Sequence, residues 1–282
     1  MRLHEKRQDI EEDVARILKE KKSIGFVPTM GALHEGHIAL VKNALANNDY
    51  VIVSIFVNPT QFNNSSDLVK YPRTLNSDLK LLSDTSPNLI VFAPAPIEVY
   101  GVNQSVLSYD FDGLEHVMEG EFRPGHFDGV GTVLKHLFQI TSPTRAYFGE
   151  KDFQQLQIVR KLVSIENLPI KIIGCPIHRH LDGLAMSSRN KRLKDVEKEN
   201  ASLIYSVLQE VKSHFGTKSV DELKDLVAER FKNNAFFKLE YFQIADSNTL
   251  QPILERKNDC KYRAFIAVFA GEVRLIDNIA LN

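Results

Sequence analysis

The sequence predicts an α/β fold, in which a Rossmann-like, doubly wound parallel sheet is followed by a smaller C-terminal α+β domain. Short apolar runs such as residues 50–57 are rich in β-branched side chains, as is typical of parallel strands buried on both faces. These runs alternate with segments of helical periodicity, which favours a parallel sheet with crossover helices. After about residue 176 the alternation stops. We therefore expect a first domain over residues 1–175 and a smaller one over residues 176–282.

In the first domain, a charged helical segment comes first, and strands and helices then take turns. The strands are expected at residues 23–27, 50–57, 88–93, 145–148 and 170–175, with a short additional strand at 105–109. The helices are expected at residues 8–21, 37–45, 76–83, 126–140 and 153–163. Residues 119–125 contain glycine and proline and are expected to form a loop.

The second domain is expected to hold helices first and antiparallel strands afterwards. Helical patterns cover roughly residues 194–214 and 219–233, and strand patterns cover residues 237–245, 261–270 and 273–280. Gly271-Glu272 between the last two strands is typical of a hairpin turn. The two domains join near residues 182–190, and we expect the second domain to swing about residues 176–190 and close over a site.

Composition excludes several classes of protein. The formal net charge of −1 shows no basic surplus, which argues against a nucleic-acid partner. Cys175 and Cys260 lie outside any Cys-x-x-Cys pair, so neither a zinc site nor a disulfide framework is expected. No apolar run approaches the length of a membrane span, and the N-terminus lacks the apolar region of a signal peptide. We expect a cytoplasmic protein that binds neither nucleic acid nor membrane.

The first strand leads through a glycine-bearing turn into a helix that opens with His34-Glu35-Gly36-His37. The first amides of a helix have no internal partner, so a strand, a turn and a helix in this order form an anion site. Imidazoles at that position can donate hydrogen bonds to phosphate, and Gly36 allows a flat ring to approach the backbone. Two surface histidines near a helix cap would produce the same pattern.

Polar residues also follow other strands of the predicted sheet. Asn58 and Gln61 follow the second strand, and Lys151 follows the fourth, with Gln155 one helical turn further on. In an open parallel sheet, ligands bind outside the carboxyl ends of the strands. The convergence predicts a site for a phosphate and a small polar substrate, although ordinary turn chemistry around Pro59, a solvated lysine and an exposed glutamine would leave the same residues.

Two further segments contribute candidate ligand-binding groups. Met186-Ser187-Ser188-Arg189 offers two hydroxyls and a guanidinium, or alternatively an ordinary helix N-cap with a capping serine. Arg123 and His126 share a loop that can close over a site or simply lie on the surface. Motifs of the P-loop, dinucleotide-binding and α/β-hydrolase classes are missing from the sequence.

Five ordered blocks, at residues 27–37, 56–62, 71–74, 148–152 and 186–190, resemble the pantothenate synthetase (pantoate–β-alanine ligase) family. This family is part of the nucleotidylyltransferase and class I aminoacyl-tRNA synthetase superfamily. The resemblance implies an AMP-forming ligase. In such an enzyme the carboxylate of pantoate attacks the α-phosphorus of ATP, which gives pantoyl adenylate and pyrophosphate, and the amine of β-alanine then displaces AMP to give pantothenate.

The resemblance also assigns roles to residues. It implies catalytic roles for His34, His37, Lys151, Ser187, Ser188 and Arg189, with His37 as the proton donor. It implies ATP binding by Pro28, Thr29, Met30, Gly31, His34, Gly36, His37, Gly149, Glu150, Lys151, Asp152, His178, Met186, Ser187, Ser188 and Arg189. It implies binding of pantoate and β-alanine by Asn58, Gln61, Gln155, Arg123 and His126.

Magnesium and a homodimer are further expectations from the family. Mg²⁺ would bridge phosphate oxygens of ATP, and Asp78 is the acidic candidate for holding it. Thr60 and Phe153 replace a methionine and a tyrosine common in relatives, and neither change touches the proposed chemistry. The alternatives are a nucleotidylyltransferase with the same histidine pair, a catalytically inactive nucleotide sensor and a tRNA-binding relative of the synthetases.

Overall fold

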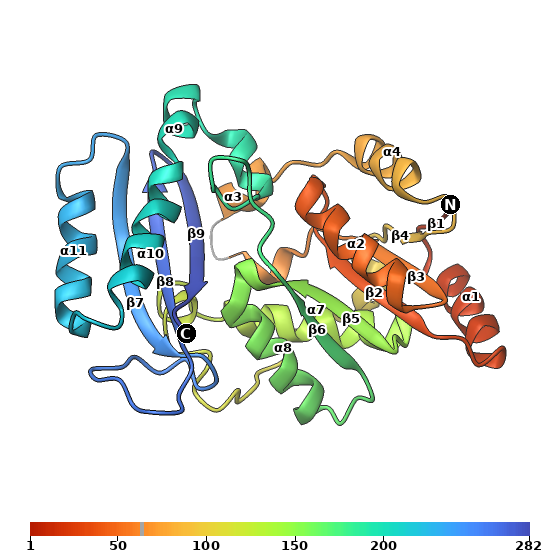
Figure 1. Ribbon diagram of the computed structural model, residues 1–282. Coiled ribbons are helices and arrows are strands. Elements are labelled where there is room, and N and C mark those ends of the chain that lie inside the picture. Colours follow the sequence, from red (N-terminus) through yellow and green to blue (C-terminus); the bar gives the residue numbers. More distant parts are fainter. Residues whose placement is uncertain (63–64) are drawn as a thin grey trace.

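The computed structural model describes residues 1–62 and 65–282 and confirms the predicted fold class. Six parallel strands form the larger sheet in the order β1-β4-β3-β2-β5-β6 (Figure 1). They are β1 (Arg2–His4), β2 (Ile24–Thr29), β3 (Tyr50–Ile55), β4 (Ile90–Phe92), β5 (Arg145–Gly149) and β6 (Lys171–Cys175). A smaller antiparallel sheet comprises β7 (Phe237–Asp246), β8 (Tyr262–Ala270) and β9 (Val273–Ala280).

Helices cover both faces of the larger sheet because its strands are apolar on both sides. On one face of the sheet, Phe26 and Ile52 pack with residues of α1 (Arg7–Lys19), α7 (His126–Thr141) and α8 (Phe153–Ile165). On the opposite face, Val27 and Val53 pack with residues of α2 (Glu35–Asn47) and α4 (Leu75–Thr85). Successive strand residues point to opposite faces, so Phe26 and Val27 belong to different halves of the core.

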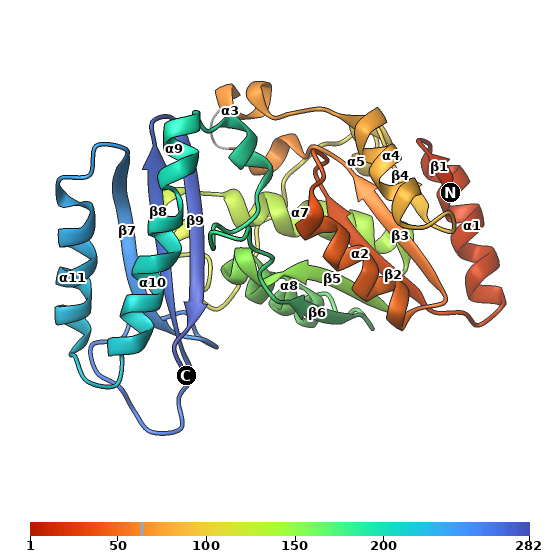
Figure 2. The same cartoon turned by 45° about the horizontal axis from the view of Figure 1, so that its top comes forward.

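The smaller sheet has its own helical cover, formed by α10 (Ser202–His214) and α11 (Val220–Lys232) (Figure 2). The remaining short helices are α3 (Ser65–Lys70), α5 (Pro96–Tyr100), α6 (Glu119–Phe122) and α9 (Asp195–Asn200). Single 3-10 turns lie at Pro59–Gln61, Glu150–Asp152 and Ser188–Arg192. None of the helices in the described ranges is both long and apolar enough to cross a membrane.

The sequence prediction was wrong at three short segments. Residues 2–4, assigned to a charged helical segment, form the edge strand β1, which pairs with β4 over too few residues to show a period. Residues 105–109 are not a strand: the amides of Leu107 and Tyr109 bond instead to side chains of Thr132 and Asp128 on α7. Residues 119–122, expected in a loop, form the helical turn α6.

We call residues 1–175 the N-terminal part and residues 176–282 the C-terminal part. The larger sheet lies in the N-terminal part and the smaller sheet in the C-terminal part, yet the two parts share buried contacts. Phe265 of β8 belongs to the same apolar cluster as Phe153 of α8, and their ring centroids lie 6.1 Å apart. The domain boundary at residue 175 and the swing of the second domain stay predictions.

Candidate active site

The turn after β2 is held by a buried carboxylate. Gly31 and Ala32 both have positive φ angles, 80° and 51°. Asp78 of α4 accepts hydrogen bonds from the amides of Ala32 (2.9 Å) and Leu33 (2.8 Å) and from the hydroxyl of Thr74. Asp78 is only 2% exposed, so its carboxylate is committed to shaping the turn. Asp78, which the sequence analysis named as a candidate for holding Mg²⁺, therefore has a structural role in this turn.

His34 and His37 are oriented by the first turn of α2. Nδ1 of His34 accepts from the amide of Gly36 (3.1 Å), and Nδ1 of His37 accepts from the amide of His34 (3.3 Å). Each neutral ring must therefore carry its proton on Nε2. The ring centroids lie 4.1 Å apart. A Cβ at Gly36 would lie 2.9 Å from the His34 ring, so only glycine leaves room for this arrangement.

Both histidines are neutral at neutral pH. Burial, followed by electrostatic interactions with His37 and Lys151, lowers the pKa of His34 to about 3. Burial, followed by Lys151 and Lys191, lowers the pKa of His37 to about 4. The pair therefore presents two Nε2–H donors without positive charge, which is suited to oxygen atoms that gain negative charge during a reaction.

Most of the predicted site residues line one cavity of about 240 Å³, here called the smaller cavity. They are Pro28, Thr29, Met30, His34, Gly36, His37, Asn58, Gln61, Gly149, Lys151, Asp152, Gln155, His178, Met186, Ser187, Ser188 and Arg189. Its apolar wall includes Val130, Val133, Leu134 and Leu137 of α7, which sequence reasoning did not single out. Gly31, Glu150, Arg123, His126 and Asp78 do not line it.

Asn58 and Gln61 line one side of the smaller cavity, here called the amide side, and are hydrogen-bonded to each other. Asn58 is 1% exposed and donates to Oε1 of Gln61 (3.1 Å), while its own oxygen accepts from the amide of Thr60. Nε2 of Gln61 contacts the sulfur of Met30 at 3.0 Å. Asn58 therefore fixes the Gln61 side chain, and Gln61 is the better placed of the two to meet a substrate.

The turn at residues 150–152 is held from the C-terminal part. Nδ2 of Asn278 on β9 donates to the carbonyls of Glu150 (2.9 Å) and Lys151 (2.8 Å). The carboxylate of Glu150 accepts from Arg263 of β8 (3.2 Å). Sequence reasoning missed Arg263 and Asn278 as supports, because both lie far along the chain from the turn that they hold.

The segment at residues 186–189 also joins the two parts. The hydroxyl of Ser188 donates to the carbonyl of Ala32 (3.1 Å), so the segment is tied to the turn after β2. The hydroxyl of Ser187 accepts from the amide of Arg189 (3.2 Å), which is the capping role that the sequence left open. Ser187, Ser188 and Arg189 nevertheless line the smaller cavity.

Arg123 and His126 do not line the smaller cavity but contact the backbone carbonyl of Gln61, which does. Nδ1 of His126 contacts the carbonyl of Gln61 at 2.9 Å, and Nη1 of Arg123 contacts Nε2 of His126 at 3.2 Å. Burial and then the neighbouring Arg123 lower the pKa of His126 to about 3. The neutral ring can therefore donate to Gln61 from Nδ1 and accept from Arg123 at Nε2.

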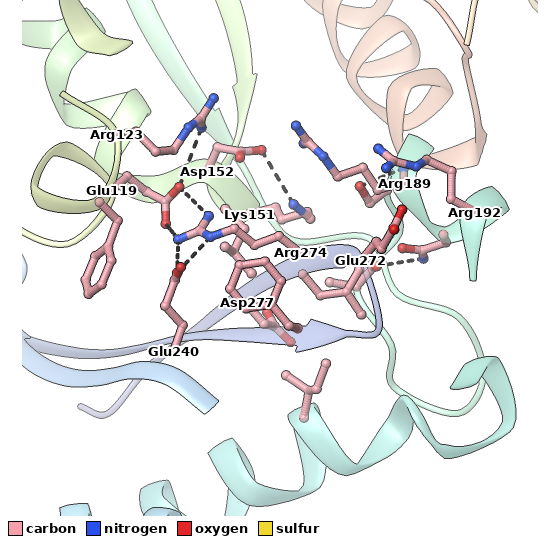
Figure 3. A pocket seen from close by; sticks show the side chains of 18 of the residues that line it. Glu119, Arg123, Lys151, Asp152, Arg189, Arg192, Glu240, Glu272, Arg274 and Asp277 are labelled. Carbon is pink, nitrogen blue, oxygen red and sulfur yellow. Dashed lines mark hydrogen bonds and ion pairs between the residues drawn. The ribbon is translucent and has the colours of Figure 1, made fainter. Parts of the chain in front are cut away.

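A larger cavity of about 530 Å³ lies between the two parts and shares Lys151, Asp152, Ser187 and Arg189 with the smaller one. Figure 3 shows its charged lining, in which Glu119 of α6 faces Arg274 of β9. Sequence reasoning placed Glu119 in a loop and gave it no role. The only available signal was its position four residues before Arg123, the spacing of an ion pair along a helix.

The comparisons with known proteins agree with one another. The pantoate–β-alanine ligase family model matches residues 2–280. The pantothenate synthetase of Christiangramia forsetii is 54% identical over 282 residues, 100% of each chain. A pantothenate synthetase structure from Thermus thermophilus has a TM-score of 0.90 at 37% identity, with 100% of this chain and 99% of that chain covered. A ligase structure from Francisella tularensis, complexed with β-γ ATP and β-alanine, has a TM-score of 0.83 at 37% identity, with 100% and 98% covered.

Proposed function

The chain belongs to the pantoate–β-alanine ligase family, and we propose that its smaller cavity is where ATP activates pantoate for attack by β-alanine. The enzyme condenses pantoate with β-alanine in an ATP-dependent reaction. One observation supports this site above all. A helix start with two imidazole donors, a lysine and an arginine lines the same cavity as the amides of Gln61 and Gln155.

ATP occupies the side of the cavity formed by the start of α2. The Nε2–H groups of His34 and His37 donate to phosphate oxygens, and Lys151 and Arg189 supply positive charge there. Adenine lies by Met186 and the backbone at His178, and Asp152 lies near the ribose. The Cβ atom of Met186 is 3.6 Å from the position of a Cβ at Gly36, so the C-terminal part already approaches the phosphate turn.

Pantoate occupies the amide side. Gln61 and Gln155 bind its hydroxyl and carboxylate groups, while Asn58 holds Gln61 in place. The branched dimethyl part of pantoate packs on the apolar wall formed by Val130 and Val133 of α7. Such a neutral, half-apolar pocket suits a small hydroxy acid better than a phosphorylated acceptor.

The chemistry follows from this arrangement. The carboxylate of pantoate attacks the α-phosphorus, the bond to the bridging oxygen breaks, and pyrophosphate leaves. The amine of β-alanine then attacks the acyl carbon, loses a proton, and AMP leaves. In both steps negative charge changes on phosphate oxygens, so pre-aligned donors such as His37 lower the barrier. We assign Arg123 and His126 to the side from which β-alanine approaches.

Magnesium enters this proposal as part of the substrate MgATP. The described ranges, 1–62 and 65–282, contain no cluster of three or more histidine, cysteine or acidic side chains that could hold a metal ion. Asp78 already accepts two amides and a hydroxyl. Phosphate oxygens and water, which Mg²⁺ prefers, are therefore its ligands in this proposal rather than a protein cage.

We further propose a cytoplasmic homodimer, as the family resemblance implies. Light scattering coupled to size-exclusion chromatography would measure a mass near twice that of the 32.0 kDa chain if this is right. A monomer at the concentrations used for activity assays would contradict the dimer and leave the site proposal unaffected.

The order of steps is tested by following pyrophosphate and AMP separately. With ATP and pantoate alone, pyrophosphate should be released in an amount comparable to the enzyme. AMP and pantothenate should appear only after β-alanine is added. ATP binding without pyrophosphate release, with any small acid, would favour a nucleotidylyltransferase or a sensor. A variant at the exposed His116, His116→Ala, serves as the matched control for histidine variants in the site.

A further inference from the structure

A buried carboxylate on α6 connects the C-terminal part to Arg123, which contacts the backbone of Gln61. Glu119 is 7% exposed and accepts two hydrogen bonds from Arg274 of β9, Nη1 to Oε2 at 2.7 Å and Nη2 to Oε1 at 2.8 Å. The hydroxyl of Tyr241 on β7 donates to Oε1 at 2.9 Å. Arg274 also bonds to Glu240 (Figure 3). Two strands of the smaller sheet therefore converge on one acidic side chain of the N-terminal part.

The same carboxylate also lies close to Arg123 and, through it, to Gln61. Oε2 of Glu119 lies 3.6 Å from Nη1 of Arg123. Arg123 contacts His126, and both side chains contact the carbonyl of Gln61. Five residues, Glu119, Arg123, Tyr241, Glu240 and Arg274, form what we call the Glu119 network.

Glu119 has a second route to the site through its backbone. Its amide donates to Oε1 of Gln154 on α8 at 3.0 Å. Gln154 is buried, and its Nε2 donates to the carbonyls of Leu114 and Val117. The neighbouring residue on α8 is Gln155, which lines the smaller cavity. Both glutamines assigned to pantoate are thus one or two contacts away from Glu119.

The charge balance of the network depends on Glu119. Burial alone would raise the pKa of Glu119, but hydrogen bonds from Arg274 and the charges of Arg274 and Arg123 lower it to about 2. Arg274 keeps Glu240 as a second partner, whereas Glu119 is the carboxylate that the described residues place within 4 Å of the half-buried Arg123. Loss of this negative charge would leave Arg123 hydrogen-bonded to a neutral histidine and a carbonyl, with the exposed Asp152 as a further negative charge acting on it.

We propose that Glu119 is a positioning residue for pantoate: by joining Arg274 to Arg123, it couples docking of the C-terminal part to the geometry of Gln61. This inference rests on the proposed role of Gln61 in the pantoate pocket. It assigns Glu119 no contact with the reacting atoms. The coupling acts on the amide side of the smaller cavity, whereas the phosphate side is held by separate contacts of Asp78, Ser188 and Asn278.

The test is the kinetics of Glu119→Gln, which keeps the shape of the side chain and removes its charge. We expect the KM for pantoate to rise at least about fivefold while the KM for ATP stays within about twofold, because ATP is held elsewhere. Glu119→Asp, which restores the charge, should recover part of the loss. Glu272→Gln is the matched control, since it breaks the ion pair with Lys70 between the same two parts without contacting Arg123.

Two results would overturn the proposal. In one, Glu119→Gln lowers Tm but leaves every kinetic constant near that of the parent, which means that Glu119 only stabilises the fold. In the other, the KM values for ATP and pantoate rise by the same factor, which means that docking is loosened in general. If Glu119→Gln does not fold, Arg274→Lys is assayed with the same criterion, because it keeps the positive charge and loses the paired hydrogen bonds.

A further variant separates this proposal from the proposed function. Gln61→Ala should raise the KM for pantoate on its own. If it does and Glu119→Gln does not, the coupling is wrong and the site stands. If Gln61→Ala leaves the KM for pantoate unchanged while the enzyme makes pantothenate, the pantoate pocket itself is wrong.

Discussion

The two walls of the site between the N-terminal and C-terminal parts are built by different means. The turn wall, residues 28–37 with Asp78, is held by hydrogen bonds within the N-terminal part and presents neutral imidazoles. The docking wall, which comprises the Glu119 network and the Glu150–Arg263 pair, is ionised and is assembled between the two parts. The turn wall is therefore complete in one part of the chain, whereas the docking wall exists only when the two parts meet.

The difference follows from the cost of burying charge. A buried ion needs a partner and further hydrogen bonds, and such a partner is most easily brought by a second element packing on the first. A neutral imidazole needs only one acceptor or donor to fix its orientation, and the backbone of α2 supplies it. The comparison teaches that the two imidazole donors can be pre-aligned before docking, whereas the turn that carries Lys151 and, in our proposal, the geometry of Gln61 depend on docking.

The largest expected effect is on the turn wall itself. His37→Ala should lower kcat at least a hundredfold, about 2.7 kcal/mol or more, since a pre-aligned donor to developing charge is lost. The fold should persist, as measured by circular dichroism and Tm. His116→Ala, at an exposed site, should leave kcat unchanged. A near-normal kcat in His37→Ala would remove His37 from the mechanism.

Removal of the carboxylate beneath the turn comes next. Asp78→Ala leaves the amides of Ala32 and Leu33 without their acceptor and should reduce the free energy of unfolding by about 2 kcal/mol. It should also raise the KM for ATP, because the turn loses its shape. Urea denaturation and steady-state kinetics measure the two effects. Asp84→Asn, exposed on the same helix, is the control. A normal KM for ATP in a folded Asp78→Ala would show that the turn keeps its shape unaided.

Acid should act on the three buried histidines and on Glu119 at different pH. His34, His37 and His126 have pKa values of about 3, 4 and 3 in the folded protein, below the ordinary value of 6.5. The unfolded chain therefore binds protons first, and stability falls as pH drops from about 6.5, by at most about 1.4 kcal/mol per pH unit for each group. The pKa of Glu119 is lowered to about 2, so its contribution is present above pH 4.5 and is lost only below it.

Urea denaturation at pH 7, 6 and 5 measures this slope. His126→Asn should make the slope shallower, because one neutral imidazole is removed. The same free energy of unfolding at pH 7 and pH 5 would contradict the neutral state of the three rings.

The smallest effect is expected at an ion pair that belongs to neither wall. Arg230 and Glu210 form two hydrogen bonds on the exposed faces of α11 and α10. Glu210→Gln should change neither Tm nor any kinetic constant measurably, since exposed pairs contribute little. A clear change in the KM for pantoate would show that charge anywhere on the C-terminal part influences the pocket, which would remove the contrast between the walls.

The sequence predicted the turn wall far better than the docking wall. His34, Gly36 and His37 are adjacent in the chain and follow a recognisable strand, so their meeting is local. Parallel strands also bring Asn58 and Lys151 to the same sheet edge, which is a topological rule rather than a matter of side-chain detail. This is why most of the predicted residues line one cavity.

The rest depended on information that no local pattern contains. Glu119 and Arg274 are 155 positions apart, and neither local sequence predicts a contact with the other. Asp78 was interpreted as a metal ligand because an acidic side chain can serve either a cation or backbone amides, and only the fold around it decides between them. Strand β1 was missed because three residues are too few to show alternation.

The shared border of the two cavities has a consequence for inhibitor design. Lys151, Asp152, Ser187 and Arg189 line both spaces, so a compound seated in the smaller cavity can be extended past them without crossing the sheet. The extension would meet a lining of both charges, in which Arg123 and Arg274 already face Glu119. A tail that both donates and accepts hydrogen bonds should therefore gain more affinity than an anionic tail of equal size, because Glu119 and Glu240 already occupy the guanidinium of Arg274.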